Sequence, residues 1–520
     1  MLLHLLWILS SAPANAAPPA IAANGVSNAA SRIPSVLPGG AVARGARILI
    51  DGVRFGSTPA AALLTIRGAA SSKQAPLLAV TPSQLEARIP LDAPLGPASL
   101  VITANGEASA AYAITVVDAN PGIYARNHLG WGPGAIDNLA GGRRIPNTAN
   151  HPARAGESIV VRATGWGGTV PRGAVIGNTA AKIRTIRRDV QPGIDELVVE
   201  IPADVVQGCF VPLRFHAAAL ASNTVTVAIH NRPGPCVPSP AFPMPHWKPG
   251  NSAVALLARS HTRELGDQKD TIVDELLAAF FDSQSADALA SPFLYGLPPG
   301  GCSLVTAPIP EAATQSVLAF LLGRPGEGIE AGSSITVNNT RFQRRIPQVP
   351  GAKGLYRSTL SGRSNPRLAE RPVPLLLDPG PVSVRSAGGG TVGAFAVTLP
   401  APGPMESGFQ GVIHSTQESL HLEWRTPITQ RLVLAAASAI SATSAATICL
   451  CLERASRREM TIPAELMRHL PLSRQTPGQP PGSITLISWP EKLEAPIRSR
   501  GLVNGEAIGI SVAQAAVLFQ

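Results

Sequence analysis

The chain has 520 residues, of which 4% are aromatic and 15% are charged, while 49 are glycine and 50 are proline. Turn-forming residues at this density leave little room for long helices, which excludes a helical bundle or a coiled coil. A hydrophobic content of 45% excludes a wholly disordered chain. Past the N-terminus, no apolar run approaches the ~18 residues of a membrane-spanning helix.

The formal net charge is +10, and almost all of the cations are arginine. The arginines are scattered, and the densest groups are pairs such as Arg143-Arg144 and Arg187-Arg188. An anion-binding surface is one interpretation of this excess. We favour the codon usage of a GC-rich genome, which replaces lysine with arginine, and expect no nucleic-acid partner.

The N-terminus has the features of an export signal. An apolar run from Leu2 to Leu9 is followed by small residues that end in Ala14-Asn15-Ala16, the A-x-A form that a signal peptidase accepts. We therefore expect residues 1–16 to be a signal peptide, although a disordered apolar tail is the alternative. A signal peptide predicts a protein that is secreted, attached to the cell surface or retained in the periplasm.

Five cysteines are few for a chain of this length. Cys209 and Cys236 flank a strand-like segment, and we expect a disulfide between them. Cys302 has two alternative partners, Cys449 and Cys451, so that one thiol is left over. The chain contains no C-x-x-C pair, and Cys449-x-Cys451 alone is a poor zinc signature.

The first half of the chain contains the same segment twice. Matching landmarks recur at an offset of 111 to 113 residues: an opening glycine before a strand (Gly45 and Gly156), an Ile-Pro strand end (Pro90 and Pro202), a later glycine (Gly96 and Gly208) and a closing strand (from Ser109 and from Ser222). A nearly constant offset over four landmarks indicates two copies of one domain of about 100 residues.

Within each copy the apolar residues alternate with a period of two. Leu197, Val199 and Ile201 fall on one side of a strand, and the residues between them fall on the other. Asn105-Gly106 has the composition of a tight hairpin turn. Short strands at this spacing predict an all-β protein with tandem immunoglobulin-like β-sandwich domains at residues 25–118 and 119–232.

The two copies also carry a series of family motifs. These are Val26-Ser27-Asn28-Ala29-Ala30-Ser31, Pro38-Gly39, Gly45 to Gly56, Val80 to Pro90, Pro121 to Tyr124, Ala153 to Gly167, Gly208 to Pro212 and Ser222 to Thr226. In this order they resemble the IPT/TIG-like immunoglobulin-fold domains that occur in tandem in secreted bacterial proteins. The resemblance covers about residues 25 to 232 and implies a secreted, non-catalytic β module.

The second half begins with a Pro-rich linker, and residues 233–300 are expected to hold this linker and one amphipathic helix. Thr271 is expected to cap this helix, with Asp274 three residues on, and Ile272, Val273, Leu276, Leu277, Phe280 and Phe281 fall at helical spacing. We interpret this stripe as a helix packed on a neighbouring sandwich rather than a partner-binding helix.

From residue 301 short strand patterns return. Asp378 to Phe395, Ser419 to Trp424 and Thr461 to Pro471 resemble the C-terminal part of longer members of the same family. The resemblance implies a sandwich-like domain at residues 301–400, a β-rich domain at 401–520 and a Cys302–Cys451 bridge.

No motif of a known catalytic constellation is present. Trp131, in the loop Gly130 to Gly134, is the best candidate for stacking on a sugar, because Trp166 occupies the repeat position of Phe55 and is expected in the core.

We interpret Asp189, Asp195 and Glu196 as a solvated loop rather than a calcium site. Two pairs of histidines on predicted strands are interpreted as surface or packing residues, namely His414 with His421 and His216 with His230.

These observations predict a secreted, non-catalytic multi-domain β-sandwich protein of adhesive, structural or carbohydrate-contact type. The expected partner is an extracellular polysaccharide or protein. No cofactor, metal, nucleic acid or membrane span is expected. The alternative function is an exported hydrolase that carries the β modules as accessories and has its active site beyond residue 250.

Overall fold

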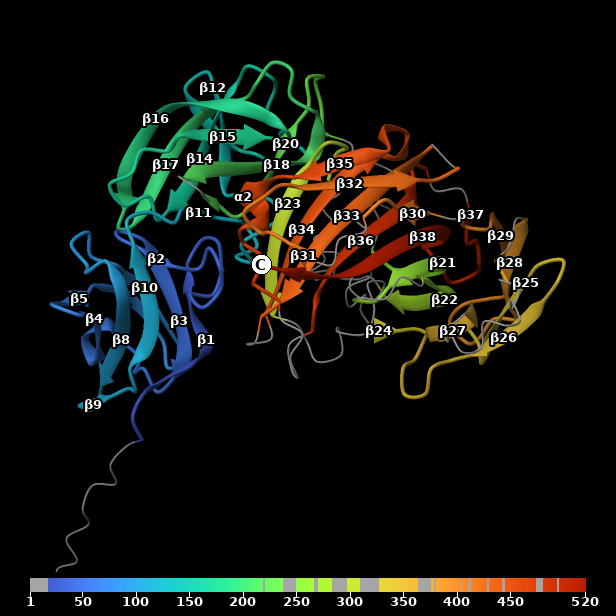
Figure 1. The fold of residues 1–520 in the computed structure, drawn as a ribbon, viewed down its shortest axis with the longest axis horizontal. Helices are drawn as coiled ribbons and strands as arrows, with labels where there is room; N and C mark the ends of the chain where they lie inside the picture. Colours follow the sequence, from blue (N-terminus) through green and yellow to red (C-terminus); the bar gives the residue numbers. More distant parts are fainter. Residues whose placement is uncertain are drawn as a thin grey trace, which may run out of the picture.

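The computed structural model of this chain describes residues 17–217, 220–236, 249–265, 270–282, 297–308, 327–362, 376–377, 380–403, 405–409, 413–427, 430–441, 445–473, 480–492 and 495–520. The expected signal peptide and most of the Pro-rich linker lie outside the described residues. The chain is nearly all β, as predicted (Figure 1). In the described ranges, no helix is long and apolar enough to cross a membrane.

The first repeat is a sandwich of two sheets. Aliphatic residues such as Ile48, Ile50 and Leu64 are fully buried between them, because alternate residues of each strand face the partner sheet. One sheet has the order β1 (Ala20–Asn28), β3 (Arg47–Val53), β7 (Gln84–Arg88) and β6 (Leu77–Val80). The other has the order β2 (Val42–Ala43), β10 (Tyr112–Val117), β8 (Gly96–Ala104), β4 (Ala62–Gly68) and β5 (Ser72–Ala75), with β9 (Glu107–Ala108) beside β8 and the 3-10 turn η1 (Pro59–Ala61) before β4.

The second repeat has the same arrangement, but its strands form one continuous 10-stranded sheet. Their order is β13 (Arg143–Pro146), β12 (Ile136–Ala140), β14 (Ser158–Thr164), β17 (Ile194–Glu200), β16 (Thr179–Gln191), β15 (Gly173–Ile176), β18 (Gly208–Ala217) and β19 (Leu220–Ala221), with β11 (Gly122–Ile123) on β14 and β20 (Val225–Ile229) on β18. The strand β16 joins the two layers, since its start pairs with β15 and the rest pairs with β17. In the first repeat Pro76, which lacks an N–H group for the ladder, separates the equivalent strands β5 and β6.

Equivalent residues of the two repeats make the same hydrogen bonds. The Ser109 hydroxyl accepts the N–H of Ile102 at 3.0 Å, and the Ser222 hydroxyl accepts the N–H of Phe215 at 2.9 Å. Each hydroxyl then donates to the carbonyl of the residue that follows the serine. The shared geometry indicates that the sequence duplication is a structural duplication.

The C-terminal unit, from residue 249 onward, is built on an 11-stranded sheet. The pairing is antiparallel except where β38 runs parallel to its neighbours β21 and β31. Its path is β23 (Cys302–Pro308), β34 (Ala445–Arg454), β33 (Arg431–Ile440), β36 (Gly482–Pro490), β38 (Asn504–Phe519), β21 (Asn251–Arg263), β22 (Asp270–Asp282) and β24 (Glu327–Gly328), with β27 (Leu355–Gly362), β31 (Ile413–His414) and β37 (Ala495–Pro496) at its margins. Because β23 pairs with β34, this sheet takes strands from both sides of the boundary expected at residue 400.

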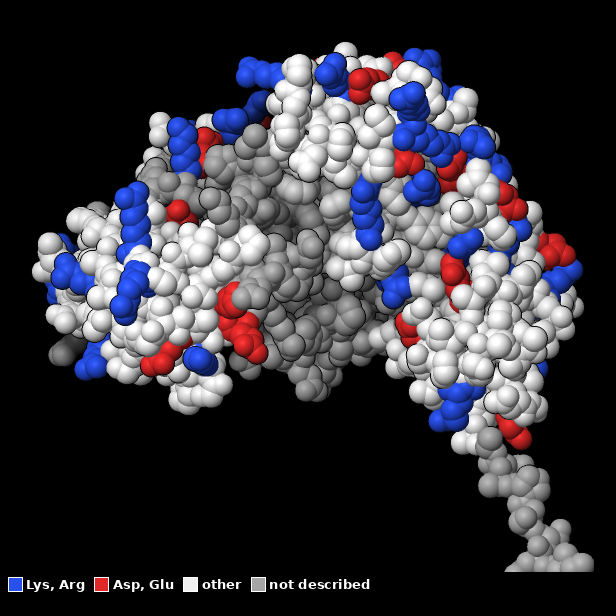
Figure 2. All heavy atoms as spheres, turned by 180° about the vertical axis from the view of Figure 1, so that it is seen from behind, with Lys and Arg blue, Asp and Glu red and all other residues white. Residues whose placement is uncertain are grey.

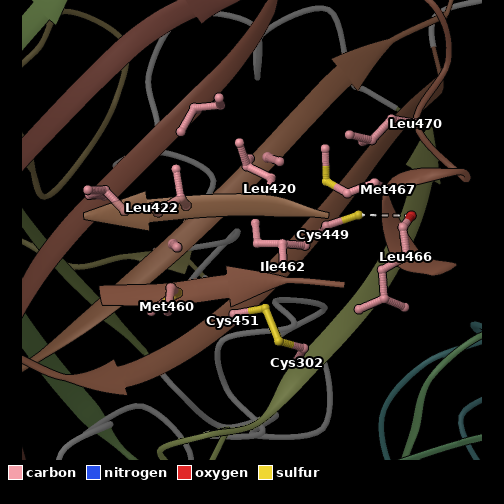
Figure 3. Close-up of a cluster of buried hydrophobic side chains, with 14 of the residues drawn as sticks. Cys302, Leu420, Leu422, Cys449, Cys451, Met460, Ile462, Leu466, Met467 and Leu470 are labelled. Carbon is pink, nitrogen blue, oxygen red and sulfur yellow. Dashed lines mark hydrogen bonds between the residues drawn. A yellow bond between two sulfur atoms is a disulfide. The ribbon is translucent and has the colours of Figure 1, made fainter. Parts of the chain in front are cut away.

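Two small sheets cover one face of the large sheet. The first covers β33 and β34 and consists of β30 (Glu406–Ser407), β32 (Leu420–Arg425) and β35 (Glu459–Ile462), followed by the helix α2 (Ala464–Met467), with the 3-10 turn η7 (Ala455–Arg457) before β35. Leu420, Leu422 and Ile462 point from it toward the large sheet (Figure 3). The second small sheet covers β21 and β22, in the order β26 (Gln343–Pro347), β25 (Ser334–Asn338), β28 (Pro381–Ser386) and β29 (Phe395–Pro400).

The helix predicted over residues 271–281 is wrong, because these residues form the strand β22, which pairs with β21 and β27. Thr271 and Asp274 therefore cap no helix. Side chains are buried on both faces of β22, Leu276 in one apolar cluster and Leu277 in another. A strand that is buried on both faces has a continuous apolar run, and periodicity alone does not distinguish such a run from a buried helix.

Both expected disulfides are present. Cys209 is joined to Cys236, and Cys302 is joined to Cys451, its direct partner across β23 and β34. Cys449 is the buried free thiol, and its Sγ donates to the carbonyl of Leu466 at 3.3 Å (Figure 3). The register of β23 thus selects Cys451 from the two alternatives that the sequence left open.

Buried polar contacts join the first repeat to the second. The side-chain amide of Asn120 donates to the carbonyls of Gly39 and Ala41, each at 2.6 Å. Asn28 in turn donates to the carbonyl of Asn120 at 3.2 Å. Since buried amides and carbonyls are costly to leave unpaired, these bonds favour one arrangement of the two repeats.

The C-terminal unit contacts both repeats. Arg214 of β18, with 4% of its side chain exposed, forms an ion pair of 3.1 Å with Glu465 of α2. His469, just after α2, donates from Nε2 to the carbonyl of Ala221 at 2.9 Å. Its ring also lies against Gly39 of the first repeat, where a Cβ atom would come within 2.2 Å of Nδ1. His469 therefore contacts all three units.

Candidate functional site

Trp131, the predicted sugar-contact residue, is buried. Only 6% of its surface is exposed, and it packs with Val254, Leu256 and Ile510 of the large sheet. A buried indole has no free face for stacking on a sugar, so the prediction for Trp131 is corrected to a packing role. The sequence suggested an open loop because Trp131 lies among glycines and a proline, and the sheet that covers it lies far along the chain.

Trp166 has the core position expected for it. It is fully buried, as is Phe55 at the equivalent position of the first repeat. Its ring meets that of Phe215 edge to face, with 5.5 Å between the ring centroids.

Neither histidine pair forms part of a metal site in the described residues. Over the described part of the chain, no group of three His, Cys, Asp or Glu side chains is placed to hold a metal ion. His421 is exposed and lies 3.6 Å from Glu423 and 3.7 Å from Glu459. Burial, with Arg214 nearby, lowers the pKa of His216.

A cluster of charged side chains lies on the outer face of the second repeat. There the strands β13, β14, β16 and β17 bring together Arg144, Arg162, Arg187 and Glu196, because residues opposite each other on neighbouring strands share a face. Figure 2 shows basic and acidic side chains intermingled over the upper right of the molecule, where the second repeat lies. The three arginines and Glu196 line a groove of about 380 Å³ together with Val190, Gln191 and Ile194. We call these seven residues the arginine groove.

Glu196 is the central carboxylate of the arginine groove. Arg144 donates to both of its oxygens, at 2.6 and 2.8 Å, and Arg187 donates to one of them at 3.4 Å. Arg162 lies 4.0 Å from Glu196 and bonds mainly to Asp137, at 2.9 Å. The hydrogen bond from Arg144, followed by the charges of the three arginines, lowers the pKa of Glu196, which keeps it ionised.

The acidic residues that the sequence suggested as a solvated loop are paired with arginines. Asp195 bonds to Arg188 at 3.1 Å, and Asp189 bonds to Arg88 of the first repeat at 3.0 Å. Each of these carboxylates, like Glu196, thus has a cationic partner, which differs from the converging oxygen ligands that a calcium ion needs.

Sequence reasoning missed the arginine groove, although it noted both arginine pairs that contribute to it. Arg143-Arg144 and Arg187-Arg188 are more than forty residues apart in the sequence, and only the sheet brings them to one face. A comparison of the two repeats was the available signal, because Arg162 of the second repeat takes the register position of Asp51 in the first.

The junction at His469 is expected to weaken at acidic pH. Burial lowers the pKa of His469 from 6.5 to about 4, while the carbonyls of Ala221 and Pro38 oppose this shift. The unfolded chain therefore takes up the proton first, so stability is complete above pH 6.5 and declines as pH falls toward 4. A shift of this size corresponds to up to about 3 kcal/mol.

Unfolding midpoints measured between pH 7.5 and 4.5 test this expectation. His469→Gln keeps a donor for Ala221 but does not titrate, so its midpoint is expected to change less with pH. The nearby Arg214–Glu465 ion pair is present in both proteins, so any effect of pH on this pair is the same in the two profiles. Parallel pH profiles for the two proteins would contradict the role of His469.

No protein-family model and no curated protein sequence matches the chain. Among solved structures, a tetra-tandem repeat from the extending region of a large adhesion protein is 11% identical, over 96% of this chain and 99% of its own, with a TM-score of 0.13. A glucan-utilization protein, SGBP-B of Bacteroides ovatus, in complex with a mixed-linkage heptasaccharide, is 10% identical over 78% of each chain, with a TM-score of 0.15. Domains 5–6 of the S-layer protein SbsC are 11% identical over 41% of this chain and 98% of their own, with a TM-score of 0.18. Likenesses this weak carry no argument about function.

Proposed function

We propose that the chain is a secreted or cell-surface, non-catalytic multi-domain β-sandwich protein that acts by contact with an extracellular polysaccharide or protein. In this proposal, residues 1–16 are the export signal and the repeats at 25–118 and 119–232 are IPT/TIG-like modules. The periplasm is the other compartment that fits an export signal.

The observation that carries the proposal is the three-way junction around His469. One buried side chain bonds to the second repeat, packs against the first and belongs to the C-terminal unit. The partly buried Arg214–Glu465 ion pair reinforces the same interface. Such contacts hold the sheets as one body with fixed outer surfaces, which suits adhesion, structural support or binding of a polymer.

The two disulfides support the proposed location. Disulfides form and persist in oxidising compartments such as the periplasm and the extracellular space. Cys302–Cys451 closes a sequence separation of 149 residues, and Cys209–Cys236 closes one of 27. Both bridges therefore stabilise the folded chain, because they lower the conformational entropy of the unfolded chain.

Binding measurements on the purified full chain test the proposal. We expect retention on at least one class of glycan in a glycan array, on isolated cell-wall polymer or on a surface protein. We also expect no turnover above background in a screen of esterase, glycosidase and peptidase substrates. Turnover that follows the purified protein through a further chromatographic step would overturn the non-catalytic assignment.

A further inference from the structure

We propose that the arginine groove binds carboxylate-bearing sugar residues of an acidic polysaccharide. The proposal rests on the proposed contact function and names the chemical class of the polymer. Its grounds are the charge of the groove, its shape, its rigidity and its absence from the first repeat.

The charges within the groove are incompletely balanced. Three guanidinium groups share two carboxylates, that of Glu196 in the groove and that of Asp137 beside it. Arg144 donates to both oxygens of Glu196, whereas Arg187 reaches Glu196 through one long hydrogen bond of 3.4 Å, and 62% of the Arg187 side chain is exposed. A guanidinium group presents paired N–H donors that match a carboxylate, so Arg187 has donors available for an incoming one.

The remaining lining suits a sugar ring. Val190, which is exposed, supplies apolar surface for the C–H face of the ring, and Gln191 supplies an amide for its hydroxyl groups. The volume of about 380 Å³ lies near the lower end of the range for ligand sites. The groove is therefore large enough for part of a sugar polymer.

The groove is held in shape by the first repeat. The hairpin that joins β16 to β17 forms one wall, and Asp189 near its tip bonds to Arg88 at 3.0 Å. Arg47 also donates from Nε to the carbonyl of Pro192 in the same hairpin, at 2.5 Å. A wall that is already ordered loses little conformational entropy when a ligand binds.

The first repeat has the same strands without the groove. The position of the Arg162–Glu196 pair is occupied there by Asp51 and Gln84, which bond to each other at 2.7 Å. The hairpin is replaced by a tight turn between Thr81 and Gln84. Two copies of one fold thus differ in the parts that build the groove, although both remain stably packed sandwiches. Packing of the sandwich therefore does not require the arginines.

The test measures binding of polygalacturonate oligosaccharides by isothermal titration calorimetry at physiological ionic strength. Carboxyl-reduced oligosaccharides of the same length are the neutral probe. We expect the full chain to bind the acidic probe at least about tenfold more tightly, and Arg187→Gln to lose about tenfold in affinity for it. Arg184→Gln is the matched control, because Arg184 lies on the same strand and pairs with Glu200 outside the groove.

Equal affinity for the acidic and reduced probes would overturn the proposal, and so would equal losses from Arg187→Gln and Arg184→Gln. An unchanged unfolding midpoint for Arg187→Gln shows that a loss of binding is not a loss of folding. Binding of neutral glycans alone would leave the proposed function in place and remove its acidic specificity. Failure to bind any glycan, cell-wall polymer or surface protein would remove both.

Discussion

Cys302→Ala is expected to lower the free energy of unfolding of the C-terminal unit by about 5 kcal/mol, because the lost bridge closes a sequence separation of 149 residues. Without the bridge, the unfolded chain regains the conformational entropy that the loop had removed. Replacing Cys302 is preferable to replacing Cys451, because Cys449 lies two residues from Cys451 on the same face of β34 and would become an alternative partner for Cys302.

Guanidinium-induced unfolding, compared with that of the unmodified protein, measures the effect. Cys209→Ala is the control, since its bridge closes a separation of only 27 residues. The entropy of loop closure grows with the logarithm of loop length, so the control is expected to lose about 3.5 kcal/mol. A larger loss for Cys209→Ala than for Cys302→Ala would contradict the loop-entropy explanation.

Asp274→Ala is expected to cost about 3–5 kcal/mol, the usual effect of removing one partner of a buried ion pair. Asp274 is fully buried, and Arg259 on β21 donates to both of its oxygens, at 2.8 and 3.0 Å. The hydroxyl of Ser361 and the N–H of Leu377 also donate to it, at 2.9 and 3.0 Å. Without the carboxylate, the charge of Arg259 stays buried and these donors lose their acceptor.

Glu275→Ala is the matched control, because Glu275 is the next residue on β22 but is partly exposed and lies 4.0 Å from Arg357. Ion pairs of this kind contribute roughly 0–1 kcal/mol. The two variants are compared by thermal and denaturant unfolding. Similar small losses for both would show that Arg259 and Asp274 are not paired in the core.

The disulfide and the buried ion pair each join two neighbouring strands of the large sheet. The disulfide joins β23 to β34 at one edge, and the Arg259–Asp274 pair joins β21 to β22 toward the other. The edge at β23 also carries a contact to the second repeat, where the N–H of Leu304 donates to the hydroxyl of Thr224 at 3.2 Å. Loss of the bridge is therefore expected to loosen the attachment of the repeats as well as the sheet itself.

The sequence alone determined the features that depend on local chemistry. Alternating apolar residues, Asn-Gly turns and strand-ending prolines predicted an all-β chain, because each acts through neighbouring backbone geometry. Duplication was visible as a constant offset between landmarks such as Gly45 and Gly156, and the core position of Trp166 followed from its match to Phe55. The Cys209–Cys236 bridge was also predicted, because both cysteines lie close to a single strand-like segment.

Only the tertiary structure decided the features that depend on distant neighbours. The apolar run of 271–281 became a strand because its side chains are buried in apolar clusters on both faces, and Trp131 was buried because residues beyond 250 cover it. Arg144 and Arg187 became one site because the sheet places β13 and β16 on either side of β12, β14 and β17, so that both arginines reach Glu196 of β17. Pairing, burial and charge clustering are set by contacts between segments far apart in the chain, and periodicity within one segment contains no information about them.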